Sequence, residues 1–208
     1  MSAPRTPADA ARDDLAFMRS LVTGRDNFQR DFGEAYGIAG ACYGVQMALH
    51  MTQAAFSWFT TPTAALLVGF TPTLVFLALM AFLVWRRRRG SAPTTANRAI
   101  GAVFQAIGLA NLALAAVIGA AAWRAQSLQV WLIFPCTVFV LQGAAWLVAW
   151  HVRRRPWLGL VGAGWFATGI AMGFAIDVLP AYMALAAFGF LAFMLAPGVA
   201  MTLRRRPA

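Results

Sequence analysis

The sequence predicts an all-α integral membrane protein, with six transmembrane helices paired as three hairpins and an amphipathic helix before them. Of its 208 residues, 61% are apolar and only 12% are charged, whereas a soluble domain is about half apolar and a quarter charged. The chain contains six apolar runs that each reach the roughly 20 residues needed to cross a bilayer. Clusters of arginine follow every second run. This composition rules out a disordered chain and argues against a soluble enzyme.

Residues 1–33 form a separate segment before the first apolar run. Its positive and negative charges balance, and it has no apolar core of the kind found in signal peptides. Thr6 followed by Pro7 is typical of a helix start, and apolar side chains then recur at helical spacing until Gly24. We expect an amphipathic helix that lies on the cytoplasmic membrane surface, or that docks on the bundle or on a partner.

The six apolar runs account for most of the remaining chain. They cover residues 35–58, 63–85, 99–123, 128–150, 157–176 and 178–203, and residues 204–208 form a short cytoplasmic tail. Tryptophans lie at or near many of the ends, as in an interfacial aromatic belt.

All 17 basic residues are arginines, and 16 of them fall on one side of the predicted topology. The positive-inside rule therefore places both termini in the cytoplasm, in a multi-pass inner membrane protein. The net charge of +10 is then a topology signal, with anionic lipid head groups as further partners, and we expect no nucleic-acid binding.

A short motif suggests a threefold repeat. Gly-Ala-x-aromatic begins at Gly40, Gly101 and Gly162, at intervals of 61 residues, in the first, third and fifth runs. The repeat predicts that these odd-numbered spans line a pseudo-threefold axis with the three glycines at one level. The same motif also begins at Gly143, in an even-numbered run, which weakens the repeat. Small residues on such helix faces allow helices to pack closely, either within one chain or between copies of the chain in a homo-oligomer.

The even-numbered runs each contain an internal proline, at Pro72, Pro135 and Pro197. A proline frees the carbonyl four residues earlier. We expect these three carbonyls to line a cavity or to be bonded by neighbouring side chains. They belong to Val68, Trp131 and Phe193.

Few residues in the spans could carry out chemistry. There is no pair of carboxylates at mid-membrane, no phosphate-binding loop and no nucleophile–base pair at recognisable spacing. The two histidines, His50 and His151, differ in predicted depth by roughly 20 Å at 1.5 Å per residue, so they cannot share one haem. We therefore expect no cofactor, no metal site and no enzymatic activity.

Uncharged polar residues are the best candidates for a functional site. Tyr43, Gln46, His50 and Gln53 share one side of the first span and should face inward, because lipid cannot satisfy them. We expect His50 to be buried and hydrogen-bonded, with Asn111 meeting it at the same level. The full candidate lining is Tyr43, Gln46, His50, Gln53, Gln105, Asn111 and Gln142.

This polar face has two interpretations. It provides interhelical hydrogen bonds in a protein with a structural, regulatory or stress-related role, or it lines a channel for a small neutral solute. In span count and hairpin order the predicted architecture resembles the urea/amide channels and the HdeD-like acid-resistance membrane proteins. A cavity along the face would favour the channel, and a packed helix interface would favour the structural role.

Overall fold

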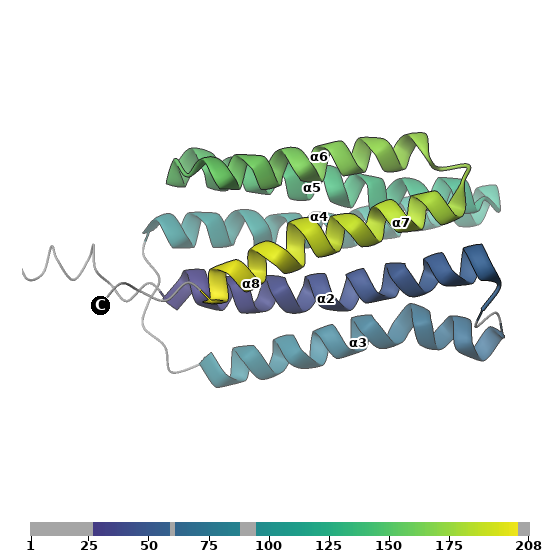
Figure 1. Cartoon of the computed structure of the whole chain (residues 1–208), viewed down its shortest axis with the longest axis horizontal. Coiled ribbons are helices and arrows are strands. Elements are labelled where there is room, and N and C mark those ends of the chain that lie inside the picture. The colour runs from purple at the N-terminus through teal and green to yellow at the C-terminus, as the bar shows by residue number, and fades with distance from the viewer. Residues whose placement is uncertain (1–26, 59–60, 88–94, 204–208) are drawn as a thin grey trace, which may run out of the picture.

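The computed structural model describes residues 27–58, 61–87 and 95–203, so the amphipathic helix predicted before Gly24 lies outside the described residues. This part of the chain is helical and contains no strand. Its elements are α2 (Asn27–Phe56), α3 (Pro62–Arg87), α4 (Thr95–Ala125), α5 (Leu128–Arg153), α6 (Pro156–Phe174), α7 (Leu179–Phe190), the π-helical turn η1 (Leu191–Leu195) and α8 (Ala196–Leu203). The helices lie side by side along one axis, and α7, η1 and α8 form a single bent rod (Figure 1).

Five helical stretches are long and apolar enough to cross a membrane, which confirms a membrane protein built of helices. They are Pro62–Arg86, Arg98–Ala125, Leu128–Arg153, Pro156–Phe174 and Leu179–Leu203. The remaining long helix, α2, has 30 residues but is less apolar, because it carries Gln46, His50 and Gln53.

Three helices end at a residue with a left-handed backbone. Ser57 follows α2 with φ 54°, Gln126 follows α4 with φ 49°, and Arg154 follows α5 with φ 53°. A residue of this conformation stops a helix and turns the chain sharply. At the α4–α5 turn, Ser127 then caps α5 by accepting a hydrogen bond from the amide of Val130. The short connections therefore arise from local backbone geometry.

Glycines bring α2 and the last helical rod into close contact. A Cβ atom at Gly40 would collide with the backbone of Leu195, and one at Gly198 would collide with the backbone of Gly37. A Cβ at Gly33 would lie 2.8 Å from the carbonyl oxygen of Gly198. In lipid, apolar burial contributes little to helix association, so close backbone approach of this kind is a main source of packing energy.

The threefold repeat is not confirmed. The most extensive interfaces join α5 to α6 and α2 to α7 and α8, whereas α2, α4 and α6 have few close approaches to one another. Gly40 packs against η1, and Gly162 packs against Gly143 of α5. The motif at Gly143, which does not fit the repeat, therefore forms a helix interface with the motif at Gly162. At Gly40, Gly143 and Gly162 the shared pattern coincides with close helix packing.

Each internal proline has a side-chain donor close by. The indole Nε1 of Trp165 donates to the carbonyl of Phe193 at 3.1 Å, which is the carbonyl freed by Pro197. The Tyr182 hydroxyl donates to the carbonyl of Leu132 at 2.7 Å, three residues before Pro135. Helices around a proline rely on such donors inside a membrane. The freed carbonyl of Phe193 is bonded by a neighbouring side chain, as expected. Beside Pro135 the bonded carbonyl is that of Leu132, one residue after the expected carbonyl of Trp131.

Candidate functional site

Two residues of the predicted polar face, Tyr43 and Gln46, are engaged by other helices. Gln46 is 8% exposed, and its Nε2 donates to the carbonyl of Gly69 on α3 at 2.8 Å. Gly69 lies three residues before Pro72, so the bonded carbonyl is one residue after that of Val68, which Pro72 frees. The ring of Tyr43 packs 5.5 Å from Phe76 and 5.7 Å from Phe190. Both residues therefore face the protein, as their position on α2 predicts.

His50 and Gln53 bond to each other on the same helix. The distance from Nδ1 of His50 to Oε1 of Gln53 is 2.8 Å, and both side chains are half-buried. Asn111 on α4 is half-buried too, and its Oδ1 has no hydrogen-bond partner within the described chain. No hydrogen bond links Asn111 to His50 there, so the expected meeting of these two residues is not found.

The other two predicted lining residues lie apart from this face. Gln105 is exposed on α4. Gln142 on α5 accepts a hydrogen bond of 3.4 Å from the Tyr36 hydroxyl, which itself accepts one of 2.6 Å from Nε1 of Trp146. Tyr36 is 5% exposed and Trp146 is 1% exposed. Gln142 thus joins a buried chain of hydrogen bonds between α2 and α5.

A small hollow lies at one end of the bundle, and Trp146 from this chain of hydrogen bonds is one of its lining residues. This arginine-rich end is where α2 and α6 begin and where α5 and α8 finish (Figure 1). The hollow measures about 40 Å³ and receives residues from α2, α4, α5, α6 and α8. Four of its ten lining residues are aromatic: Phe32, Phe104, Trp146 and Trp157. These rings also pack on one another, with Phe32 4.7 Å from Phe104.

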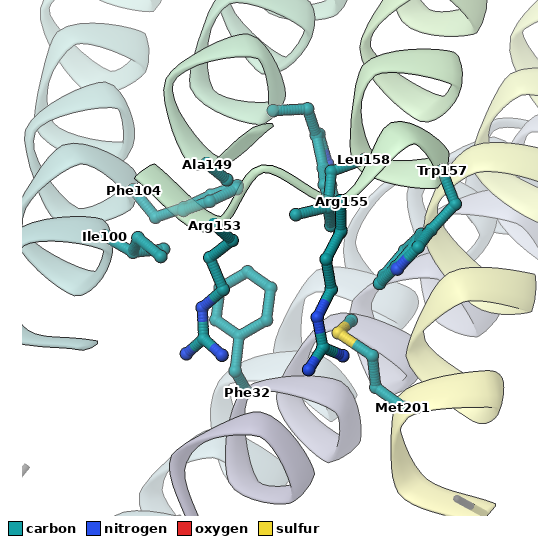
Figure 2. A pocket seen from close by; sticks show the side chains of 10 residues that line it. Phe32, Ile100, Phe104, Ala149, Arg153, Arg155, Trp157, Leu158 and Met201 are labelled. Atoms are coloured by element: carbon teal, nitrogen blue, oxygen red, sulfur yellow. The ribbon is translucent and has the colours of Figure 1, made fainter. Parts of the chain in front are cut away.

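Two arginines stand at the mouth of the hollow. Figure 2 shows the guanidinium groups of Arg153 and Arg155 on the same side, flanking the ring of Phe32. Arg153 ends α5 and Arg155 is the residue before α6, while Arg154 between them adopts φ 53° and does not line the hollow. The left-handed turn at Arg154 therefore lets its two neighbours share one opening.

A second, open groove runs between α2, α3 and α8. Its volume is about 590 Å³, and most of its lining is apolar. At one end, Glu34 accepts hydrogen bonds from Arg86 at 2.6 Å and from Arg30 at 3.3 Å. The Glu34 side chain is 18% exposed. This ion pair joins α2 to α3 at the arginine-rich end, in keeping with an anchoring role for Glu34 at the membrane boundary.

The hollow was not predicted from the sequence, because it depends on the ends of five helices. Two signals pointed to it. Phe32 and Tyr36 are one helical turn apart, and Trp157 lies two residues after Arg155, in the first turn of a helix. Within the described residues, no group of three or more His, Cys, Asp or Glu side chains could hold a metal ion.

Neither the hollow nor the groove is lined by Tyr43, Gln46, His50 or Gln53. The hollow and the groove both lie toward the arginine-rich end, while Tyr43 and Gln46 of the polar face contact other helices. Comparison of the chain with protein-family models, with curated proteins and with solved structures finds no match, so its function must be inferred from these residues.

Proposed function

We propose that the chain is a six-span inner membrane protein with both termini in the cytoplasm. α2 lies lengthwise beside the other helices and packs on α3, α7 and α8 (Figure 1). Its 30 residues are more than enough to cross a bilayer. Its polar residues are tolerable in a span because they face protein, as the bond from Gln46 to Gly69 illustrates.

Topology can be tested with reporter fusions. The proposal requires cytoplasmic signals after residues 91 and 208, and periplasmic signals after residues 60, 126 and 179. It rests on the arginine distribution, because loops rich in arginine remain on the cytoplasmic side. A periplasmic signal after residue 91 would overturn the entire orientation.

We further propose that the protein has a structural or regulatory role and acts by binding at its cytoplasmic face, without catalysis. The observation that supports this is the engagement of the polar face. Gln46 bonds to α3, the ring of Tyr43 packs between Phe76 and Phe190, and His50 bonds to Gln53. Groups committed to helix contacts are not free to replace the water shell of a passing solute.

A channel for a small neutral solute is the competing function, and a swelling assay distinguishes the two. Proteoliposomes containing the full chain should swell in urea, acetamide or glycerol no faster than liposomes without protein. Swelling that depends on the solute, and that is lost in Gln46→Leu but not in Gln105→Leu, would establish the channel. Gln105 is a suitable control because it is exposed on α4.

A further inference from the structure

We propose that the hollow at the arginine-rich end binds the phosphate group of an anionic amphiphile, with the phosphate at Arg153 and Arg155 and a short apolar segment against the aromatic wall. The natural source of this chemistry is an anionic phospholipid of the inner leaflet. This proposal rests on the proposed topology, which places the hollow at the cytoplasmic interface. Basic pockets between transmembrane helices on that side are known to take such head groups.

The charges at the mouth suit an anion. Arg153 and Arg155 present two guanidinium groups to one opening (Figure 2), and a guanidinium matches a phosphate with two parallel hydrogen bonds. The mouth lies where α5 ends and α6 begins, so the favourable dipole at the start of α6 is offset by the opposite dipole at the end of α5. None of the residues lining the hollow is acidic. The two guanidinium groups therefore supply the positive potential at the mouth.

The wall limits what can accompany the phosphate. Apart from the two arginines it is aromatic and aliphatic, with Phe104 contributed by α4, Trp146 by α5 and Met201 by α8. A volume of about 40 Å³ accommodates only about three groups the size of a water molecule, at 10–15 Å³ each. A nucleotide base is too large for this space. The first carbons beside a phosphodiester fit it and would bury apolar surface there.

The turn formed by residues 153–155 contains a matched control for the two arginines at the mouth. Arg154 lies between the two mouth arginines and carries the same charge, yet it does not line the hollow. Arg153→Gln, Arg154→Gln and Arg155→Gln each remove one positive charge from the same turn. If net charge alone attracted the anion, all three variants would lose the same affinity. A defined site predicts that Arg153→Gln and Arg155→Gln lose affinity and that Arg154→Gln does not.

The test is a titration of the purified full-length protein in neutral detergent, read by native mass spectrometry. The probes are dihexanoyl phosphatidylglycerol, dihexanoyl phosphatidylcholine and inorganic phosphate. We expect one phosphatidylglycerol to bind tightly, and binding to weaken about tenfold in Arg153→Gln and in Arg155→Gln, as loss of a charge-assisted hydrogen bond implies. Arg154→Gln should bind like the wild type. Matching elution profiles in size-exclusion chromatography show that the variants are folded.

Three results would overturn the proposal. Equal weakening in Arg154→Gln would mean that the lipid senses only the charge of the turn. Equal binding of phosphatidylcholine would mean that anionic charge is not recognised. Inorganic phosphate binding as tightly as the lipid would mean that the apolar wall contributes nothing and that a soluble anion is the ligand. The titration is independent of orientation in the membrane, so it can succeed or fail separately from the reporter fusions.

Discussion

The outer helices α3 and α4 differ sharply from the packed part of the bundle. Only 6% of the most apolar stretch of α3 or α4 is buried within the protein, against 33–39% for α5, α6 and the last helical rod. α4 and α5 have the same mean hydropathy of 1.9, so hydropathy alone does not distinguish the two regions. The difference shows that the apolar residues of α3 and α4 mostly lie on the surface of the protomer, whereas many of those in the other helices contact protein.

Glycines also have different roles in the two regions. Gly40 and Gly198 allow backbones to approach closely, whereas a Cβ atom at Gly69 or Gly108 would have nothing within 4 Å. Gly40 and Gly198 are required by their neighbours. Gly69 and Gly108 only lower helix propensity. Substitutions in the two regions should therefore have opposite consequences.

The largest expected effect comes from filling the glycine contact between α2 and α8. Gly198→Ala should lower the free energy of unfolding by about 1–3 kcal/mol or more, because the new Cβ meets backbone of Gly37, which cannot rotate away. Gly108→Ala should leave stability unchanged or raise it by up to about 1 kcal/mol. Thermal unfolding of both variants in the same detergent measures the difference. Equal loss in the two variants would show that the contact does not form.

A smaller effect is expected where a tryptophan bonds a carbonyl freed by proline. Trp165→Phe keeps an aromatic ring but removes the donor to the carbonyl of Phe193, which should cost about 1–2 kcal/mol. Pro197→Ala restores a backbone N–H near that carbonyl. In a double-mutant cycle, the cost of Trp165→Phe should therefore shrink when Pro197 is replaced. Strict additivity of the two changes would argue against the carbonyl as the link.

The polar residues Gln46 and Gln105 offer a matched pair across the two regions. Gln46→Leu leaves the carbonyl of Gly69 without its donor and should cost about 1 kcal/mol. Gln105→Leu removes an exposed amide from α4 and should change protomer stability by less than about 0.5 kcal/mol. Unfolding curves recorded side by side make the comparison. A loss at Gln105 as large as at Gln46 would show that α4 is covered by protein, as in a homo-oligomer.

Much of the fold could be predicted from the sequence, because a span must be long and apolar whatever its neighbours are. The carbonyl of Phe193 was predictable for a similar reason, since a proline acts on its own helix. Its partner Trp165 was not, because that contact depends on how α6 meets η1. The threefold repeat suggested by Gly-Ala-x-aromatic is not confirmed. At Gly143 and Gly162 the motif places small residues where α5 and α6 meet.

The candidate site was predictable only in part. The helical period of α2 correctly predicted that Gln46 faces the protein, because periodicity fixes which residues share a helix face. It could not place Asn111 beside His50, because that meeting depended on a repeat that the helix contacts do not follow. The hollow beside Arg153 and Arg155 depends on the left-handed residue Arg154 and on five helix ends, none of which appears as a period in the sequence.

The smallest expected effect is at His50, near the border between the packed and exposed parts of α2. Its Nδ1 lies 2.8 Å from Oε1 of Gln53 on the same helix, so its loss exposes no partner on another helix. His50→Leu should therefore cost only about 0.6 kcal/mol, a typical value for one hydrogen bond in a membrane. His50→Gln keeps a donor and an acceptor and should cost less. Both are measured by unfolding in detergent beside the wild type. A cost at His50 well above that at Gln46 would mean that a group outside the described residues bonds to the imidazole.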